Sequence, residues 1–160
     1  MKPKIVSVIL LSLLITPLGT YAQTNANTDE AVVRQVVQHY IDGWIDENIE
    51  SLRDAFHPKA KLFSISDKYD LREDTLKDVA SAFKDNRLRH VPKRGELGIN
   101  MNIISIDVAG DAAFAKVETT HPKRNAAGFD YLSLKKFRQG WKIVSRVSSV
   151  NNEQGQPASS

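Results

Sequence analysis

Three titratable side chains are the candidate catalytic groups of this chain: His57, His121 and Asp130. Each histidine precedes a proline at the end of a predicted element, and imidazole exchanges protons near neutral pH. The alternative for both is a histidine that hydrogen-bonds backbone at a turn. Asp130 is followed by Tyr131 on a predicted strand, so their side chains point to opposite faces. We expect Tyr131 and Ser133 to point inward, with Asp130 at a dimer face, a cap or a salt bridge.

Two aromatic side chains, Tyr40 and Trp44, lie one helical turn apart and are candidates for a binding pocket. A hydroxyl, an indole N–H and two aromatic rings suit a flat ligand. The alternative is core packing, which stabilises a fold by about 1.5–3 kcal/mol for each large buried side chain. The full set of predicted ligand contacts combines aromatic and polar side chains: Tyr40, Trp44, Phe56, Phe63, Thr119, His121, Tyr131, Ser133 and Trp141.

Other kinds of chemistry have no support in the sequence. The chain has no cysteine, which excludes thiol catalysis and Cys-ligated metals. It also lacks the HxH and HExxH spacings of metal sites and the glycine-rich motifs of nucleotide sites. We therefore expect neither a metal nor a cofactor. The basic residues Arg87, Arg89, Lys93 and Arg94 have no aromatic residues between them, which favours a solvated connection over a nucleic-acid surface.

The first residues have the pattern of a secretory signal. Lys2 and Lys4 precede an apolar run from Ile5 to Ile15, and small residues lead to a cleavage site after Ala22. The run is shorter than the roughly 20 apolar residues of a membrane span. We expect residues 1–22 to be removed and the protein to be periplasmic or secreted, without a membrane anchor. Cleavage lowers the formal net charge from +3 to +1, so no electrostatic partner such as nucleic acid is expected.

Helical patterns come first in the remaining chain. Residues 23–28 are predicted to be flexible, and three- and four-residue apolar spacing predicts a helix over 29–45. A second helix is expected from Ile49 to Phe56, where His57-Pro58 ends it because proline disfavours helix in the residue before it. A third helix starts at Asp74 or Thr75, after a charged turn or short hairpin from Ser66 to Leu71.

Strands make up the rest. They are expected over 60–65, 99–108 and 112–121, followed by a loop over 122–128. A hairpin then covers 129–150, with Gly140 in its tight loop. Alternation predicts that Trp141, Ile143, Ser145, Val147 and Ser149 share one face of the returning strand. Residues 151–160 are expected to form a disordered tail.

Helices followed by antiparallel strands indicate an α+β fold with one domain over residues 29–150. The amphipathic first helix is the natural cover for one face of the sheet. A curved sheet closed by helices leaves a conical space, and ligands usually bind in such concave spaces.

This organisation resembles the nuclear transport factor 2-like superfamily, the cystatin-like cone fold of SnoaL and ketosteroid isomerase, and within it the putative lumazine-binding family. The matching segments are 40–44 (YIDGW), 52–58 (LRDAFHP), 106–113 (IDVAGDAA), 130–134 (DYLSL) and 140–144 (GWKIV). In the isomerases a tyrosine on the first helix donates to the oxyanion, and Tyr40 lies at a similar place. The positions of their two carboxylates correspond to Phe63-Ser64 and to Ser133, so isomerase chemistry is not expected.

The resemblance implies a domain that binds a small, partly apolar or aromatic molecule between the first helix and the sheet, as a homodimer joined through the sheet. Two alternatives remain open. One is a small enzyme of the isomerase, lyase or cyclase type that uses His57, His121 or Asp130, which requires at least two titratable groups in the cavity. The other is an interaction module whose cone is filled by its own aromatic side chains.

Overall fold

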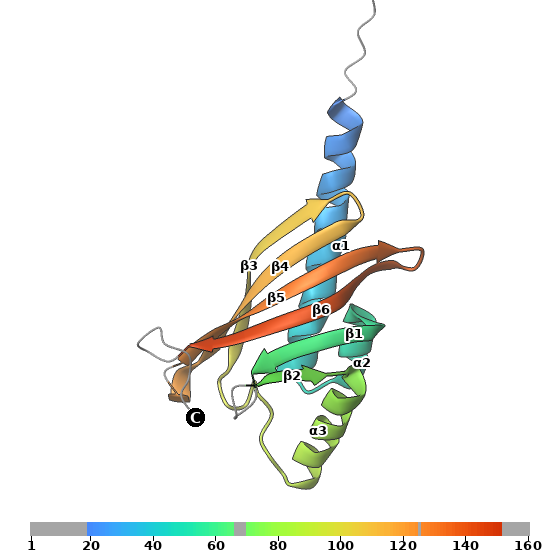
Figure 1. Cartoon of the computed structure of the whole chain (residues 1–160). Helices are drawn as coiled ribbons and strands as arrows, with labels where there is room; N and C mark the ends of the chain where they lie inside the picture. Colours follow the sequence, from blue (N-terminus) through green and yellow to red (C-terminus); the bar gives the residue numbers. More distant parts are fainter. Residues whose placement is uncertain (1–18, 66–69, 125, 152–160) are drawn as a thin grey trace, which may run out of the picture.

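The computed structural model describes residues 19–65, 70–124 and 126–151. Three α-helices in these ranges pack against one six-stranded sheet, which confirms the α+β fold (Figure 1). The sheet order is β2-β1-β6-β5-β4-β3, and β1 and β6 are its parallel neighbours. The helices are α1 (Gly19–Ile45), α2 (Ile49–Ala55) and α3 (Leu76–Leu88), and the strands are β1 (Phe56–Ile65), β2 (Leu71–Asp74), β3 (Asn100–Ala109), β4 (Ala112–His121), β5 (Ala126–Phe137) and β6 (Gly140–Asn151).

Helix α1 crosses one face of the sheet and supplies much of the core (Figure 1). Its apolar stripe is buried as the three- and four-residue spacing predicted, with Val33, Val37 and Tyr40 fully buried. The helix begins at Gly19 rather than at Asp29. Residues 20–28 contain neither glycine nor proline, so nothing in them interrupts the helix. The helix therefore includes residues 23–28, and their flexibility stays a prediction. Signal cleavage stays a prediction, and residues 1–18 lie outside the described residues.

The predicted hairpin is present, and its strands β5 and β6 form the centre of the sheet. Phe137 pairs with Gly140, so the loop has two residues, 138 and 139, rather than the expected three that included Gly140, which begins β6. Gly140 has a φ of 108°, a left-handed value that favours glycine. The hairpin lies across α1, so its inward side chains face the helix (Figure 1).

A β-bulge in β6 reverses the predicted alternation of its second half. Leu134 pairs with Ile143 and Ser133 with Ser145, so Val144 is an extra residue on β6. Trp141 and Ile143 are buried as expected, but Val147 is 50% exposed. Arg146 instead pairs with the fully buried Leu132 and shares its inward face. The predicted common face of residues 141, 143, 145, 147 and 149 is therefore wrong beyond Val144, because one inserted residue exchanges the two faces of a strand.

Several element boundaries differ from those predicted. β1 starts at Phe56 rather than Ala60, so Pro58 lies inside the strand, and β5 starts at Ala126 rather than Phe129. Thr75 caps α3 through reciprocal hydrogen bonds with Asp78, as its position before the apolar pattern indicated. β2 pairs with β1 as a short antiparallel hairpin. Of the turn or short hairpin expected from Ser66 to Leu71, residues 66–69 lie outside the described residues.

Asp29 ties α1 to the end of the β5–β6 hairpin. Its carboxylate accepts hydrogen bonds from Lys136 Nζ at 2.7 and 2.8 Å and from Trp141 Nε1 at 3.0 Å. The Lys136 hydrogen bond, followed by that of Trp141, lowers the pKa of Asp29 below its usual value. A lowered folded-state pKa means that the stabilisation is fully present above the unfolded pKa of about 3.9 and is lost as the pH falls through the folded value.

Asp29→Asn is therefore expected to lower the melting temperature at pH 7. The difference from the wild type should shrink as the pH falls below about 3.9 and vanish below the lowered folded-state pKa, where the wild-type carboxyl is also neutral. Thermal unfolding followed by circular dichroism between pH 2.5 and 7 measures this. Asp107→Asn, at an exposed position on β3, is the control and should have no pH-dependent effect. If the melting temperature of Asp29→Asn were lower than that of the wild type by the same amount at every pH, this would contradict the role of the ionised carboxylate.

The outer face of the sheet, away from α1, exposes apolar side chains. Phe114, Tyr131 and Val147 are 61%, 48% and 50% exposed, and Tyr131 pairs with Val147 across β5 and β6. An apolar surface on the sheet is where the expected homodimer would form, and the dimer stays a prediction. Among the described residues, no helix has the length and apolar character needed to cross a membrane.

Candidate functional site

A buried hydrogen-bond network joins α1 to the central hairpin. The Tyr40 hydroxyl donates to Asp130 Oδ2 at 2.6 Å, and Ser148 Oγ donates to the other carboxylate oxygen of Asp130. Tyr40 is fully buried and Asp130 is 8% exposed. Burial, followed by the negative charge of Asp130, raises the pKa of Tyr40 well above its usual value. The phenol therefore stays protonated and keeps donating to Asp130 across the physiological pH range.

Trp44, one turn further along α1, is approached by two arginine side chains. The guanidinium carbon of Arg94 lies 4.4 Å from the centre of a Trp44 ring, and that of Arg146 lies 4.7 Å away. Arg94 comes from the loop before β3, and its Nη1 donates to the Trp44 carbonyl at 3.4 Å. Burial is the main cause that lowers the pKa of Arg94, and Arg146 adds to it by repulsion. Cation–π contacts hold both cations against the ring.

These residues, except Tyr40, line a pocket of about 210 Å³, here called the inner pocket. Asp130, Arg146 and Ser148 come from the central hairpin, and Trp44 comes from α1. The remaining lining residues are Arg94, Met101, Thr119, His121 and Gly128. Positive, negative, hydrogen-bonding and apolar groups therefore meet between the first helix and the sheet, in the place where the sequence predicted a cavity.

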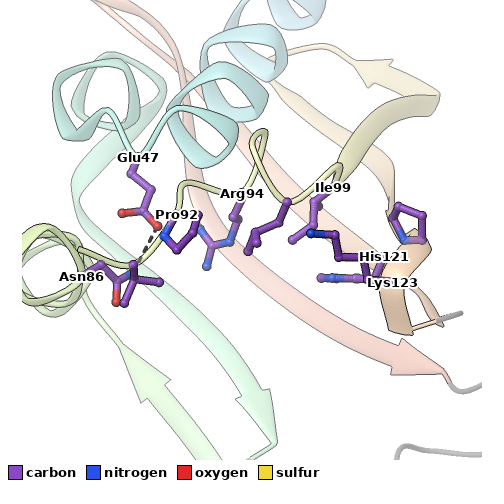
Figure 2. A pocket seen from close by; sticks show the side chains of 10 residues that line it. Glu47, Asn86, Pro92, Arg94, Ile99, His121 and Lys123 are labelled. Carbon is purple, nitrogen blue, oxygen red and sulfur yellow. Dashed lines mark hydrogen bonds between the residues drawn. The ribbon is translucent and has the colours of Figure 1, made fainter. Parts of the chain in front are cut away.

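A second hollow of about 390 Å³, here called the loop cleft, shares Arg94 and His121 with the inner pocket. Figure 2 shows Glu47 and Asn86 at one end, Arg94 between, and His121 and Lys123 at the other. Asn86 Nδ2 donates to Glu47 Oε1 at 3.1 Å, and Glu47 is 6% exposed. The shared residues make the loop cleft the neighbouring compartment of the inner pocket.

Four of the predicted site residues line the inner pocket: Trp44, Thr119, His121 and Asp130. Tyr40 lies behind it and holds Asp130. The predicted orientation on β5 is wrong, because Asp130 points inward and Tyr131 is 48% exposed. Asp130 shares its face with Leu132 and Leu134, which are buried in the core, and alternation then places Tyr131 and Ser133 on the outer face.

The other predicted site residues lie elsewhere. Phe63 neighbours the fully buried Leu62 on β1 and so faces the outer side. Phe56 packs on Tyr40 in the core, with ring centres 5.8 Å apart, and Trp141 donates to Asp29. His57 stacks on Phe137 at 4.8 Å. Phe137 is seven residues from Asp130 along β5, roughly 23 Å at the usual strand rise, so His57 and Asp130 do not share a site.

The sequence reasoning missed Arg94, Arg146 and Ser148. Arg94 was assigned to a solvated loop, but the loop folds back so that Gly95 N donates to the Ile45 carbonyl at 3.2 Å. Arg146 and Ser148 face inward because of the bulge at Val144. The local sequence does give one indication that Arg146 belongs to the site, because it is a charged residue within a strand of the central hairpin. The local sequence around Arg94 gives no such indication, since its loop packs against a distant helix end.

The described residues contain no group of three or more His, Cys, Asp or Glu side chains placed to hold a metal ion. The side chains that line the inner pocket place hydrogen-bond donors and two cations around one carboxylate. Such a site can orient and neutralise a polar group on a ligand.

Comparison with known proteins agrees with the fold. The family model described as putative lumazine-binding matches residues 28–149, and no curated protein matches. A protein of unknown function from Shewanella baltica OS155, described as NTF2-like, has a similar structure with a TM-score of 0.65, 19% identity, and coverage of 83% of this chain and 98% of that chain.

Two further solved structures share the fold. An NTF2-like protein of unknown function from Methylobacillus flagellatus KT has a TM-score of 0.63 and 24% identity, over 78% of this chain and 93% of that chain. An NTF2-like protein with a cystatin-like fold from Novosphingobium aromaticivorans has a TM-score of 0.62 and 12% identity, over 84% and 90%. The solved structures share the NTF2-like, cystatin-like fold of this chain, and the family match shows that the chain belongs to the putative lumazine-binding family.

Proposed function

We propose that the protein is an exported binding protein for a small, partly apolar or aromatic molecule, held in the inner pocket. The observation that carries this is the pocket itself, about 210 Å³ in volume and lined by Trp44 and Met101 beside several polar groups. An apolar wall with a few convergent polar groups is the usual composition of a small-molecule site. The membership in a family named for ligand binding supports the same class of function.

The volume favours this proposal over a cone filled by its own aromatic side chains. One water molecule takes up about 30 Å³ of the liquid, so the inner pocket has room for more than a few waters. The loop cleft adds space beside it and shares Arg94 and His121. The aromatic side chains of the core pack below the pocket, with Trp44 and Phe83 ring centres 5.6 Å apart, and do not fill it.

A small enzyme is the second candidate, and one specific observation favours it. His121 and Asp130 both line the inner pocket, which is the convergence of titratable groups that catalysis requires. Asp130, however, already accepts hydrogen bonds from Tyr40 and Ser148. A base must be within reach of the proton that it removes, and two of the acceptor positions of Asp130 are occupied. Binding is therefore the function that the site supports best.

Native mass spectrometry of the protein purified from its own host tests this proposal in one measurement. We expect the subunit mass to lack residues 1–22, because we propose cleavage after Ala22. We expect an assembly of two subunits and a retained molecule of small mass, which is released by mild collisional activation. The retained mass identifies the ligand.

Trp44→Ala provides the control for specific retention, because it removes the largest apolar wall of the inner pocket. The variant should lose the retained molecule while an outer-face variant, Phe114→Ser, keeps it. A molecule retained equally by Trp44→Ala would place binding outside the inner pocket. A wild-type protein that carries nothing and binds no member of a small-molecule library would contradict the proposed function.

A further inference from the structure

The inner pocket contains two buried hydrogen-bond donors without a partner in the described structure. They are Trp44 Nε1 and Arg146 Nε. Trp44 is 8% exposed and the Arg146 side chain is 12% exposed. Leaving a buried donor unpaired destabilises the fold, and more so for a charged group. Both residues line the same pocket and are in cation–π contact, so one acceptor placed there can serve both.

Asp130 does not supply that acceptor. Its nearest oxygen lies 3.9 Å from Arg146 Nε, which is beyond hydrogen-bond distance. Its oxygens instead accept from the Tyr40 and Ser148 hydroxyls. The raised pKa of Tyr40 keeps that phenol a donor, so the arrangement persists across the physiological pH range.

The charges at the inner pocket also favour an additional hydrogen-bond acceptor there, and one that is negatively charged. Arg94 and Arg146 both contact Trp44, and burial is the main cause that lowers the pKa of Arg94, with a smaller contribution from the charge of Arg146. Asp130 is the carboxylate that lines the inner pocket, and Glu47, to which Asn86 donates, acts on Arg94 from the loop cleft. Among the residues that line the inner pocket two cations therefore face one carboxylate, and an additional anion relieves the repulsion between the cations.

We infer that the ligand of the inner pocket is a carboxylic acid, bound as its anion, whose carboxylate accepts hydrogen bonds from Trp44 Nε1 and Arg146 Nε beside the Arg94 guanidinium. This rests on the proposed small-molecule binding and names its chemical class. A carboxylate has two oxygens in one plane and matches the planar donor set of arginine. The apolar remainder of the acid lies against Met101 and the Trp44 edge, and Thr119 and His121 are its polar neighbours.

Isothermal titration of the full chain with matched acid and amide pairs tests the inference. The probes are benzoate with benzamide and phenylacetate with phenylacetamide, which differ in charge and hardly in shape. At least one acid is expected to bind about 10- to 100-fold more tightly than its amide, the difference for hydrogen bonds to a charged group. Raising the salt concentration should weaken binding of the acid and leave the amide unchanged.

Two conservative variants assign the contacts. Trp44→Phe keeps an aromatic ring and removes Nε1, and it should weaken acid binding about 5- to 10-fold, the loss of one hydrogen bond. Arg146→Met keeps the length of the side chain and should abolish the preference for the acid. Arg138→Met, in the distant hairpin loop, is the matched control and should bind as the wild type does. Thermal unfolding of each variant shows whether it is folded at the titration temperature.

Each outcome decides the inference. Equal affinity for acid and amide would overturn it and leave small-molecule binding intact, because a neutral polar group or water then satisfies the two donors. Acid binding that is unchanged in both Trp44→Phe and Arg146→Met would also overturn it. If no acid binds while native mass spectrometry detects a retained neutral molecule, the anion is excluded and the proposed function stands. If neither acids nor any retained molecule is found, both fail.

Discussion

Replacing Asp130 with alanine is expected to lower the free energy of unfolding by about 3–5 kcal/mol, the usual cost of leaving the partner of a buried ion pair alone. Asp130 is 8% exposed and joins α1 to the central hairpin through Tyr40 and Ser148. Its removal leaves the buried Tyr40 hydroxyl without its acceptor. It also leaves Arg146, whose side chain is 12% exposed, without its nearest negative charge. Urea denaturation at pH 7 measures the loss.

The matched control for this variant is Asp107→Ala, which removes the same atoms from an exposed position on β3 and should change the stability by less than about 0.5 kcal/mol. The double variant Asp130→Leu with Arg146→Met separates the two causes. Replacing both charges by apolar side chains is often neutral or stabilising, so the double variant should recover most of the lost stability. A loss below about 1 kcal/mol in Asp130→Ala would contradict the network.

Gly43→Val is expected to destabilise the protein by about 3 kcal/mol, because α1 and α2 touch at this glycine. A β-carbon on Gly43 would lie 2.5 Å from Leu52 Cδ2, 2.7 Å from Leu52 Cγ and 3.0 Å from the Leu52 backbone nitrogen. Leu52 is fully buried, so its side chain has no free space to move into. Valine adds two methyl groups to this clash, and the helices must separate to accommodate them.

The competing effect at Gly43 is helix propensity, since valine favours helix over glycine by less than about 1 kcal/mol. Overpacking exceeds this gain, and the net effect is a loss. Gln35→Val, on the exposed side of the same helix, is the control for placing valine in the helix without the clash; because valine is a slightly poorer helix former than glutamine, it should lose only a few tenths of a kcal/mol. Chemical denaturation of both variants compares them. A Gly43→Val protein as stable as Gln35→Val would show that the two helices are not in close contact.

Much of the fold could be read from local patterns along the chain. The amphipathic spacing over 29–45 identified the helix that covers the sheet, and Gly140 identified the central hairpin. Both patterns are set by residues close together in sequence, and the physical cause is local: helical periodicity and the left-handed backbone of a tight turn. The same reasoning placed Trp44, Thr119 and His121 near one cavity, because α1 and the end of β4 each carry their own inward face.

The composition of the inner pocket was decided by contacts between distant segments. Alternation alone predicts Tyr131 and Ser133 as the inward pair of β5, yet Leu132 and Leu134 fix the inward face and bring Asp130 with them. The extra residue Val144 turns Arg146 inward, and the loop that carries Arg94 is held by a hydrogen bond from Gly95 to Ile45 at the end of α1. An alternating pattern does not by itself show which of its two sets of side chains faces the core, so it has two equivalent phases. A bulge, in turn, leaves no mark in the composition of a strand. Tertiary packing selects between the phases, which is why the charged half of the site emerged only in the folded structure.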